Sequence, residues 1–251
     1  MTQRQKPLSS SAIDADARQD AYQAATTSAA APVITIDGPS GTGKGTIANL
    51  LADYLGWHLL DSGALYRTLA LAARRRGIDL EAGPELGRLA AQIQVLLEGE
   101  RVLLDGEDVS ELIRTAEAGV DASRVAVHPE VRGALLGWQR GAAVAPGLVA
   151  DGRDMGSRVF PDALLKIYLD ASPEERAQRR YKQLKDKGMD ANLRDLVQAL
   201  RVRDERDRER AESPLLVPCA AIIVDSTSLS IDEVFDQVLG LAKVALESAD
   251  P

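Results

Sequence analysis

The chain has 251 residues and a mass of 26.9 kDa, with 45% hydrophobic and 27% charged residues, as expected of one or two globular domains. Its formal net charge of −8 disfavours a broad nucleic-acid-binding surface, and its single cysteine excludes intrachain disulfides and multi-cysteine zinc sites. No apolar run approaches the length of a membrane span and no secretory leader is recognisable, so we expect a cytoplasmic protein without membrane or nucleic-acid partners.

The first part of the chain, residues 1 to about 31, is rich in Ser, Ala, Thr, Gln and Asp and lacks apolar periodicity. We expect a disordered N-terminal tail there, and an inert extension is favoured over a partner-binding arm. A single folded domain is expected over residues 32–251.

From residue 33 onward, short β-rich runs alternate with helical patterns. Residues 33–36 predict a buried strand that enters a glycine-rich turn, and apolar residues recur at helical spacing from 44 to 55. Further strands are expected at 57–60, 147–150, 163–169 and 220–224, with a helix ending near 77 and a last helix over about 230–245. This alternation predicts an α/β fold with a central parallel sheet flanked by helices on both faces.

One region interrupts that alternation. Residues 93–98 and 101–104, joined by Gly99 and Glu100, predict a β-hairpin, and the turn at 105–106 allows a third short strand. We expect a small inserted α+β subdomain over about residues 83–126.

The strongest motif is Gly-Pro-Ser-Gly-Thr-Gly-Lys-Gly-Thr, residues 38–46. Its glycines let successive backbone N–H groups surround a phosphate, and the positive end of the following helix points to the same place. Lys44 supplies a charge for the β- and γ-phosphates. The general pattern has Ser or Thr directly after the lysine, whereas here Gly45 intervenes and the hydroxyl is on Thr46. That variant resembles the loop of nucleoside monophosphate kinases.

Two polar clusters follow predicted strands, where ligands gather in open α/β sheets. Ser62 begins a helix that also carries Tyr66 and Arg67, and it is equally compatible with a plain helix N-cap. The segment Asp-Gly-Arg-Asp, residues 151–154, places Arg153 and Asp154 at the same rim. An arginine there suits a phosphate, because its guanidinium can bind two oxygens at once.

A third cluster is the charged segment of residues 200–210. If it is helical, Arg203, Asp207 and Arg210 fall at i, i+4 and i+7 on one face. A solvated, salt-bridged face is the usual meaning of such a pattern, but next to a phosphate site the same face can hold a nucleotide.

Together these motifs resemble the bacterial cytidylate kinases from Pro32 to about Ala245, with the segments at 34–41, 60–67, 151–156 and 203–208 as the most specific pieces. The resemblance implies a P-loop kinase core, an enlarged monophosphate-binding subdomain and a short helical lid at about 172–190. It also implies transfer of the γ-phosphate of ATP to CMP or dCMP in pyrimidine nucleotide metabolism, with Mg²⁺ as cofactor, by a monomer.

The resemblance further assigns roles by position. ATP would bind to the loop residues Gly38, Pro39, Ser40, Gly41, Thr42, Gly43, Lys44, Gly45 and Thr46, with Thr46 near the magnesium ion. CMP would bind to Ser62, Tyr66, Arg67, Ser123, Arg132, Arg153, Asp154, Arg203, Asp207 and Arg210. Of these, Ser62, Ser123, Arg132 and Asp154 would read the cytosine, Arg67, Arg153 and Arg210 the phosphate, and Arg203 and Asp207 the ribose. The catalytic groups would be Lys44, Arg153, Arg210 and the lid arginines Arg179 and Arg180.

Two alternatives stay open. A kinase for another nucleoside monophosphate shares the same loop and fold. A P-loop nucleotide switch is disfavoured because the chain lacks an Asn-Lys-x-Asp guanine motif and because its arginines are expected opposite the loop.

Overall fold

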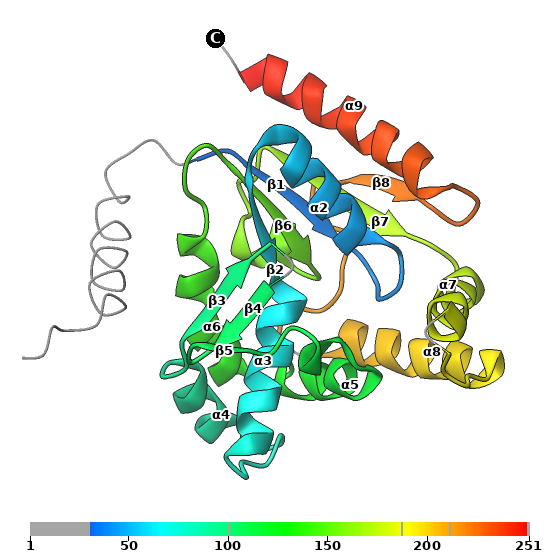
Figure 1. Cartoon of the computed structure of the whole chain (residues 1–251). Helices are drawn as coiled ribbons and strands as arrows, with labels where there is room; N and C mark the ends of the chain where they lie inside the picture. The colour runs from blue at the N-terminus through cyan, green and yellow to red at the C-terminus, as the bar shows by residue number, and fades with distance from the viewer. Residues whose placement is uncertain (1–30, 100, 187, 211, 250–251) are drawn as a thin grey trace, which may run out of the picture.

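The structure is a computed structural model that describes residues 31–99, 101–186, 188–210 and 212–249 (Figure 1). Its centre is a five-stranded parallel sheet of order β2-β6-β1-β7-β8. The strands are β1 (Val33–Asp37), β2 (His58–Asp61), β6 (Leu148–Gly152), β7 (Leu165–Asp170) and β8 (Ile222–Asp225). The predicted α/β fold with a parallel sheet is confirmed. The tail predicted for residues 1 to about 31 lies outside the described residues, except for residue 31.

Helices cover both faces of this sheet. On one face lie α2 (Lys44–Leu55) and α9 (Ile231–Ala249), which share a buried apolar core with β1 and β7 (Figure 1). On the other face, α6 (Pro129–Gly141) and a π-helical turn, η3 (Met155–Val159), pack against β1, β2 and β6. The helix bounds predicted for α2 are those observed, because a glycine-rich segment precedes it and Gly56 ends it.

A second core lies beside the sheet. It is formed by a three-stranded antiparallel sheet of β3 (Val95–Glu98), β4 (Arg101–Leu104) and β5 (Glu107–Asp108), together with several helices. These are α3 (Ser62–Arg75), α4 (Gly83–Ala90), the short 3₁₀ helix η2 (Leu112–Arg114), α5 (Ala116–Val125) and α6. The predicted hairpin and third strand are confirmed. Leu69 of α3 and Leu135 of α6 belong to this core, so its packing extends beyond residues 83–126 on both sides.

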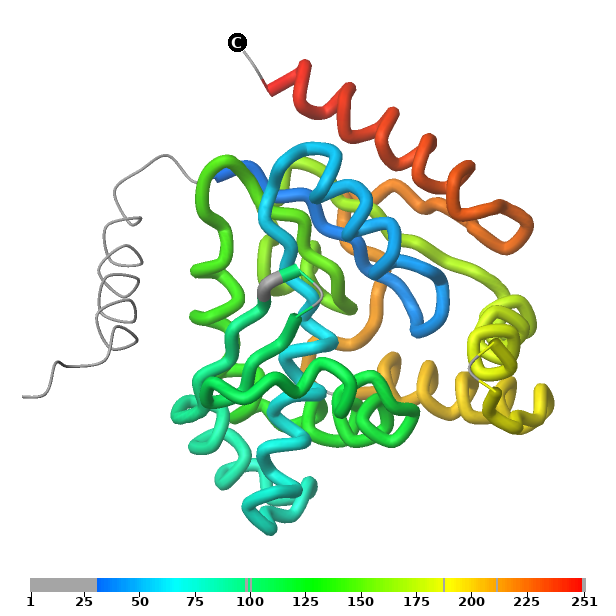
Figure 2. Tube along the Cα trace, in the orientation of Figure 1, coloured from blue at the N-terminus to red at the C-terminus, as the bar shows by residue number. Residues whose placement is uncertain are grey.

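The remaining helices are α7 (Pro173–Asp186) and α8 (Leu193–Glu209), which lie between β7 and β8 in the sequence. They pack against each other. The loop from β1 to α2 turns toward this pair (Figure 2). Because the carboxyl ends of parallel strands meet at one edge of a sheet, the segments that follow β1, β2, β6 and β7 converge there. Within the described residues no helix is both long and apolar enough to cross a membrane.

Candidate active site

A cavity of about 690 Å³ lies at the edge where these segments meet. Most residues expected at the site from the sequence line it: Ser40, Gly41, Thr42, Gly43, Lys44, Gly45, Thr46, Ser62, Tyr66, Arg67, Ser123, Arg132, Arg153, Asp154, Arg179, Arg203, Asp207 and Arg210. Gly38, Pro39 and Arg180 are not among the lining residues. The fold thus brings segments more than a hundred residues apart in the sequence around one space.

On one wall, Lys44 is buried against the glycine loop. Its Nζ donates a hydrogen bond to the carbonyl oxygen of Pro39 at 3.4 Å and lies 3.8 Å from Oδ1 of Asp151. Burial, and then the charge of Arg153, lowers the pKa of Lys44 to about 8, although Asp151 opposes that shift. Burial raises the pKa of Asp151 to about 6 against the effect of Lys44. Burial thus shifts the pKa values of the two groups toward each other, and their mutual attraction opposes both shifts.

The same carboxylate lies close to the glycine that follows the lysine. A Cβ atom at Gly45 would lie 3.3 Å from Oδ2 of Asp151, closer than most Cβ contacts. A serine or threonine at that position would require the carboxylate to shift by a few tenths of an ångström, and in this chain the hydroxyl is one residue later, on Thr46.

At the end of β1, the carboxylate of Asp37 is completely buried. It accepts hydrogen bonds from the backbone N–H groups of Met155 and Gly156, both at 2.8 Å. Burial raises the pKa of Asp37 to about 7, in spite of those two hydrogen bonds. Asp37 therefore ties the strand before the phosphate loop to the turn that carries Arg153 and Asp154. We did not expect this residue from the sequence.

On the opposite wall, Asp207 is only 4% exposed. It accepts a hydrogen bond from Nε of Arg153 at 3.0 Å and one from Oγ of Ser123 at 3.4 Å. Burial alone would raise the pKa of Asp207, but the charges of Arg153 and Arg203 hold it below its usual range. The alternative of a solvated face is therefore wrong for Asp207, and Ser123 is buried rather than a surface serine.

The backbone position of Arg210 differs from the predicted one. The predicted helix is observed as α8, but it ends at Glu209, and Arg210 has an extended backbone with φ −60° and ψ 136°. It is therefore not the i+7 position of a continuous helical face. Its Nε donates to the carbonyl oxygen of Ser213, and the side chain still reaches the cavity.

Near the start of α6, the side chain of Arg132 contacts those of Asp154 and Tyr66. Arg132 donates to Oδ2 of Asp154 and to the carbonyl oxygen of Ala126, and its guanidinium lies 5.7 Å from the centre of the Tyr66 ring. Burial raises the pKa of Tyr66. Arg132 thus turns away from the core, which its neighbours Val131 and Leu135 enter.

Ser62 is not the N-cap of its helix. The capping side chain is that of Asp61, which accepts from the N–H of Ala64 at 2.8 Å and also from Nη2 of Arg67 at 3.0 Å. Oγ of Ser62 donates instead to the carbonyl oxygen of Asp151 at 2.8 Å, which links α3 to the end of β6.

Several guanidinium groups at the cavity have unused donors. Among the described residues, Nε of Arg67, Nε of Arg203 and Nη2 of Arg210 are buried without a hydrogen-bond partner. Burial, and then the charge of Arg153, lowers the pKa of Arg203 to about 10. Buried donors without acceptors cost free energy, and a bound anion would supply the missing acceptors. This wall is therefore suited to a phosphate group.

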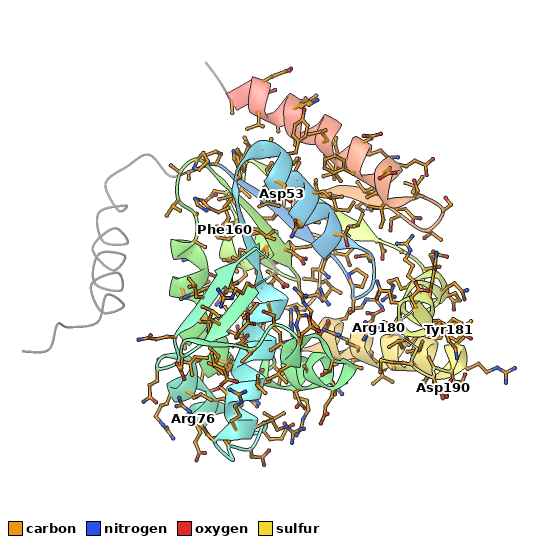
Figure 3. The ribbon with its side chains drawn as sticks, viewed as in Figure 1. Asp53, Arg76, Phe160, Arg180, Tyr181 and Asp190 are labelled. Carbon is orange, nitrogen blue, oxygen red and sulfur yellow. The ribbon has the colours of Figure 1, made fainter. Side chains whose placement is uncertain are left out.

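Helix α7 brings a different set of side chains to the cavity from the one expected. Nη1 of Arg179 donates to the carbonyl oxygen of Thr42 in the glycine loop at 3.1 Å. Arg180, labelled on α7 in Figure 3, donates to Oε1 of Gln183 at 3.4 Å and does not line the cavity. Residues 179, 182, 183 and 186 share one helical face, and residue 180 lies outside it, about 60° beyond residue 183. Lys182 on that face is a candidate that sequence reasoning missed.

The cavity also contains oxygen groups suited to a magnesium ion. Oδ1 of Asp151 is buried and accepts no hydrogen bond from the described residues, and Thr46 lines the same space. Hydroxyl and carboxylate oxygens suit Mg²⁺, which is commonly held by one or two carboxylates together with phosphates. The described part of the chain has no cluster of three or more His, Cys, Asp or Glu that could hold a metal by itself. These residues fit an ion that arrives with a nucleotide.

Comparisons with known proteins give the family of this chain. The family described as cytidylate kinase matches residues 34–244. A protein named cytidylate kinase from Aeromonas salmonicida (strain A449) is 58% identical over 223 residues, which cover 87% of this chain and 97% of that protein. A protein of the same name from Polynucleobacter asymbioticus (strain DSM 18221 / CIP 109841 / QLW-P1DMWA-1) is 52% identical over 210 residues, covering 84% and 96%.

Among solved structures, TT1252 from Thermus thermophilus is similar with a TM-score of 0.44 and 21% identity, over 89% of this chain and 100% of that one. The family assignment rests on the family match and on the sequence relatives. The matched segment, residues 34–244, contains both the glycine loop and the arginines that line the cavity. The chain belongs to the cytidylate kinase family.

Proposed function

We propose that this chain transfers the γ-phosphate of ATP to CMP or dCMP, giving ADP and CDP or dCDP, within the cavity described above. The observation that supports the site is that a phosphate loop and buried arginines with unused donors face the same space. The loop suits the donor nucleotide and the arginines suit the phosphate of the acceptor.

On the donor side, the loop of residues 38–46 holds the ATP phosphates through the backbone N–H groups of residues 40–46, which line the cavity, and Lys44 neutralises charge at the β- and γ-phosphates. Thr46 and Asp151 would hold the magnesium ion that accompanies ATP, and that ion would neutralise charge that develops during transfer. Arg179 approaches the same loop from α7 through its hydrogen bond to Thr42, so it can contact the phosphates when ATP binds.

On the acceptor side, Arg67, Arg153 and Arg210 hold the phosphate of CMP. Ser62, Ser123, Arg132 and Asp154 face the cytosine, with Tyr66 behind Arg132, and Arg203 and Asp207 face the ribose. The contacts among them support this arrangement, because Asp207 already orients Arg153 and Asp154 already orients Arg132.

The reaction needs positioning and charge neutralisation rather than a covalent intermediate. A phosphate oxygen of CMP attacks the γ-phosphorus in line, the new P–O bond forms, and the bond to the β-phosphate oxygen of ADP breaks. Lys44, Arg153 and Arg210 stabilise the charge of the transition state. We propose that residues of about 172–190 act as a lid that excludes water, with Lys182 in place of Arg180 on the face toward the cavity.

The closing test is a coupled assay of ADP release with a panel of nucleoside monophosphates. We expect turnover with CMP and dCMP and little with AMP, GMP or UMP. A clear preference for another monophosphate would show that the assigned acceptor is wrong, although the chain would still be a nucleoside monophosphate kinase. ATP binding without turnover on any acceptor would favour a nucleotide switch. We propose that the chain acts as a monomer, and the mass of the active species in solution tests this.

A further inference from the structure

Arg176 of α7 lies behind the phosphate loop, outside the cavity. It is 1% exposed, its Nε donates to the carbonyl oxygen of Ala171 at 3.0 Å, and its Nη1 donates to that of Ser40 at 2.9 Å. The loop also rests on the stem of this side chain. A Cβ atom at Gly41, where φ is +86°, would lie 3.2 Å from the Cβ of Arg176. Arg176 therefore supports the outer side of the loop at two successive residues.

The same guanidinium binds Asp204 of α8. Nη1 donates to Oδ1 at 3.2 Å and Nη2 to Oδ2 at 2.5 Å, and Asp204 is 3% exposed. Asp204 directly follows Arg203 and precedes Asp207 by less than one helical turn. The helix that presents the acceptor-side groups is thus held, through one side chain, to the loop that holds the donor phosphates.

We infer that Arg176 and Asp204 are a positioning pair that sets the distance and orientation of α8 relative to the phosphate loop. Bidentate guanidinium–carboxylate contacts fix orientation as well as distance. In-line transfer depends on both, because a misplacement of about 1 Å can cost about 100-fold in rate. The inference rests on the proposed function, since its effect is on transfer between the two nucleotides.

A buried ion pair can also be merely structural, and the two roles are separable. Removing one partner leaves a buried charge without compensation, whereas replacing both partners by apolar side chains is often neutral for stability. The decisive variant is therefore the double substitution Arg176→Met and Asp204→Leu. We expect it to melt within a few degrees of the wild type, although the carbonyls of Ala171 and Ser40 lose a donor, to keep both KM values within about threefold, and to lose about 10- to 100-fold in kcat.

Arg176→Lys is the conservative variant. An ammonium group lacks the planar fork that meets both oxygens of Asp204 and the carbonyls of Ala171 and Ser40 at once, so we expect a kcat between those of the wild type and the double variant. If the double variant has wild-type kcat together with wild-type melting behaviour, the pair is only structural and the inference is overturned. The double variant decides even if the single Arg176→Met protein does not fold.

The chain offers a matched control between the same two helices. Nη2 of Arg201 on α8 donates to Oε1 of Glu174 on α7 at 2.6 Å, but both side chains are more than half exposed and neither contacts the loop. Glu174→Gln should leave kcat unchanged, because exposed pairs contribute little. An equal loss of kcat in this control would refute a specific role for Arg176. CMP-dependent ADP release by the wild type tests the proposed function, and the ratio of variant to wild-type kcat tests this inference.

Discussion

The substitution Asp207→Asn probes the acceptor wall most directly. Asp207 is nearly isosteric with asparagine, so the change removes a charge and one acceptor oxygen with little change in volume. In the structure Asp207 accepts from Arg153 at 3.0 Å and from Ser123 at 3.4 Å. If Asp207 also accepts from the ribose 2′-OH, the substitution affects CMP through both roles but dCMP through the orientation of Arg153 alone.

The magnitude follows from the kind of bond lost. A hydrogen bond to a charged group contributes about 1.5–3 kcal/mol, and each 1.4 kcal/mol is a factor of ten. Asparagine keeps one acceptor oxygen but no charge, so weakening of the bond to Arg153 should lower kcat/KM by up to about 10- to 100-fold for both substrates. Loss of a charged acceptor for the 2′-OH should lower it by a comparable further factor for CMP alone. The wild type should consequently prefer CMP to dCMP, and the variant should show a smaller preference.

The assay is kcat/KM for CMP and dCMP in wild type and variant, combined as a double difference. Equal losses would show that Asp207 orients Arg153 without contacting the ribose. No loss with either substrate would refute the reasoning, because Asp207 would then neither orient Arg153 nor bind the acceptor. Glu205→Gln is the control, since Glu205 is an exposed carboxylate on the same helix and does not line the cavity.

Four further outcomes are expected. Lys44→Ala should lower kcat by about 100- to 1,000-fold with the circular dichroism spectrum unchanged, because it removes a group that stabilises transition-state charge; near-normal kcat would contradict the loop assignment. Chelation by EDTA should abolish turnover, and added Mg²⁺ should restore it, because the transferred phosphate needs that charge neutralised; turnover that persists in EDTA would count against the magnesium assignment. Burial raises the pKa of Asp37 to about 7 in the folded chain. Below about pH 4 this carboxyl is protonated in both the folded and the unfolded chain. As the pH rises from about 4 through 7, the unfolded chain loses the proton first, so the free energy of unfolding decreases. Melting temperatures from pH 4 to 8 should therefore fall more steeply for the wild type than for Asp37→Asn, and parallel profiles would contradict the shift. Deletion of residues 1–31 should leave kcat and Tm unchanged, because that segment has little apolar surface to bury; a large drop in either would show that it contacts the folded domain.

Much of the fold could be predicted because the local signals are strong. The β-rich run before residue 38, the glycine segment and the apolar period of residues 44–55 each depend on short-range sequence, and together they determine a strand, a turn and a helix. The same holds for the hairpin at residues 95–104. The residue types at the site could also be predicted, because a glycine-rich loop and arginine side chains are the groups that bind phosphates.

Contacts between distant residues could not be predicted in this way. The hydrogen bonds of Asp37 to residues 155 and 156 span more than a hundred positions, and those of Arg176 to Ser40 do as well. No sequence period encodes such pairs, because they exist only after parallel strands have brought their loops to one edge. Nor could a motif show that one carboxylate oxygen of Asp151 accepts no hydrogen bond from the described residues, since that depends on what surrounds it.

The face that a helix turns toward the cavity could be predicted only in part. The sequence shows that Arg179, Arg180 and Lys182 share a helix, and their angular positions follow from 3.6 residues per turn. Which face meets the cavity depends on how α7 packs against α8 and the loop, and that packing is fixed by the buried contacts of Arg176. The sequence alone thus determines which chemical groups are present and the local elements that carry them. Only the tertiary structure decides which of those groups face one another, because burial and pairing are properties of the assembled core.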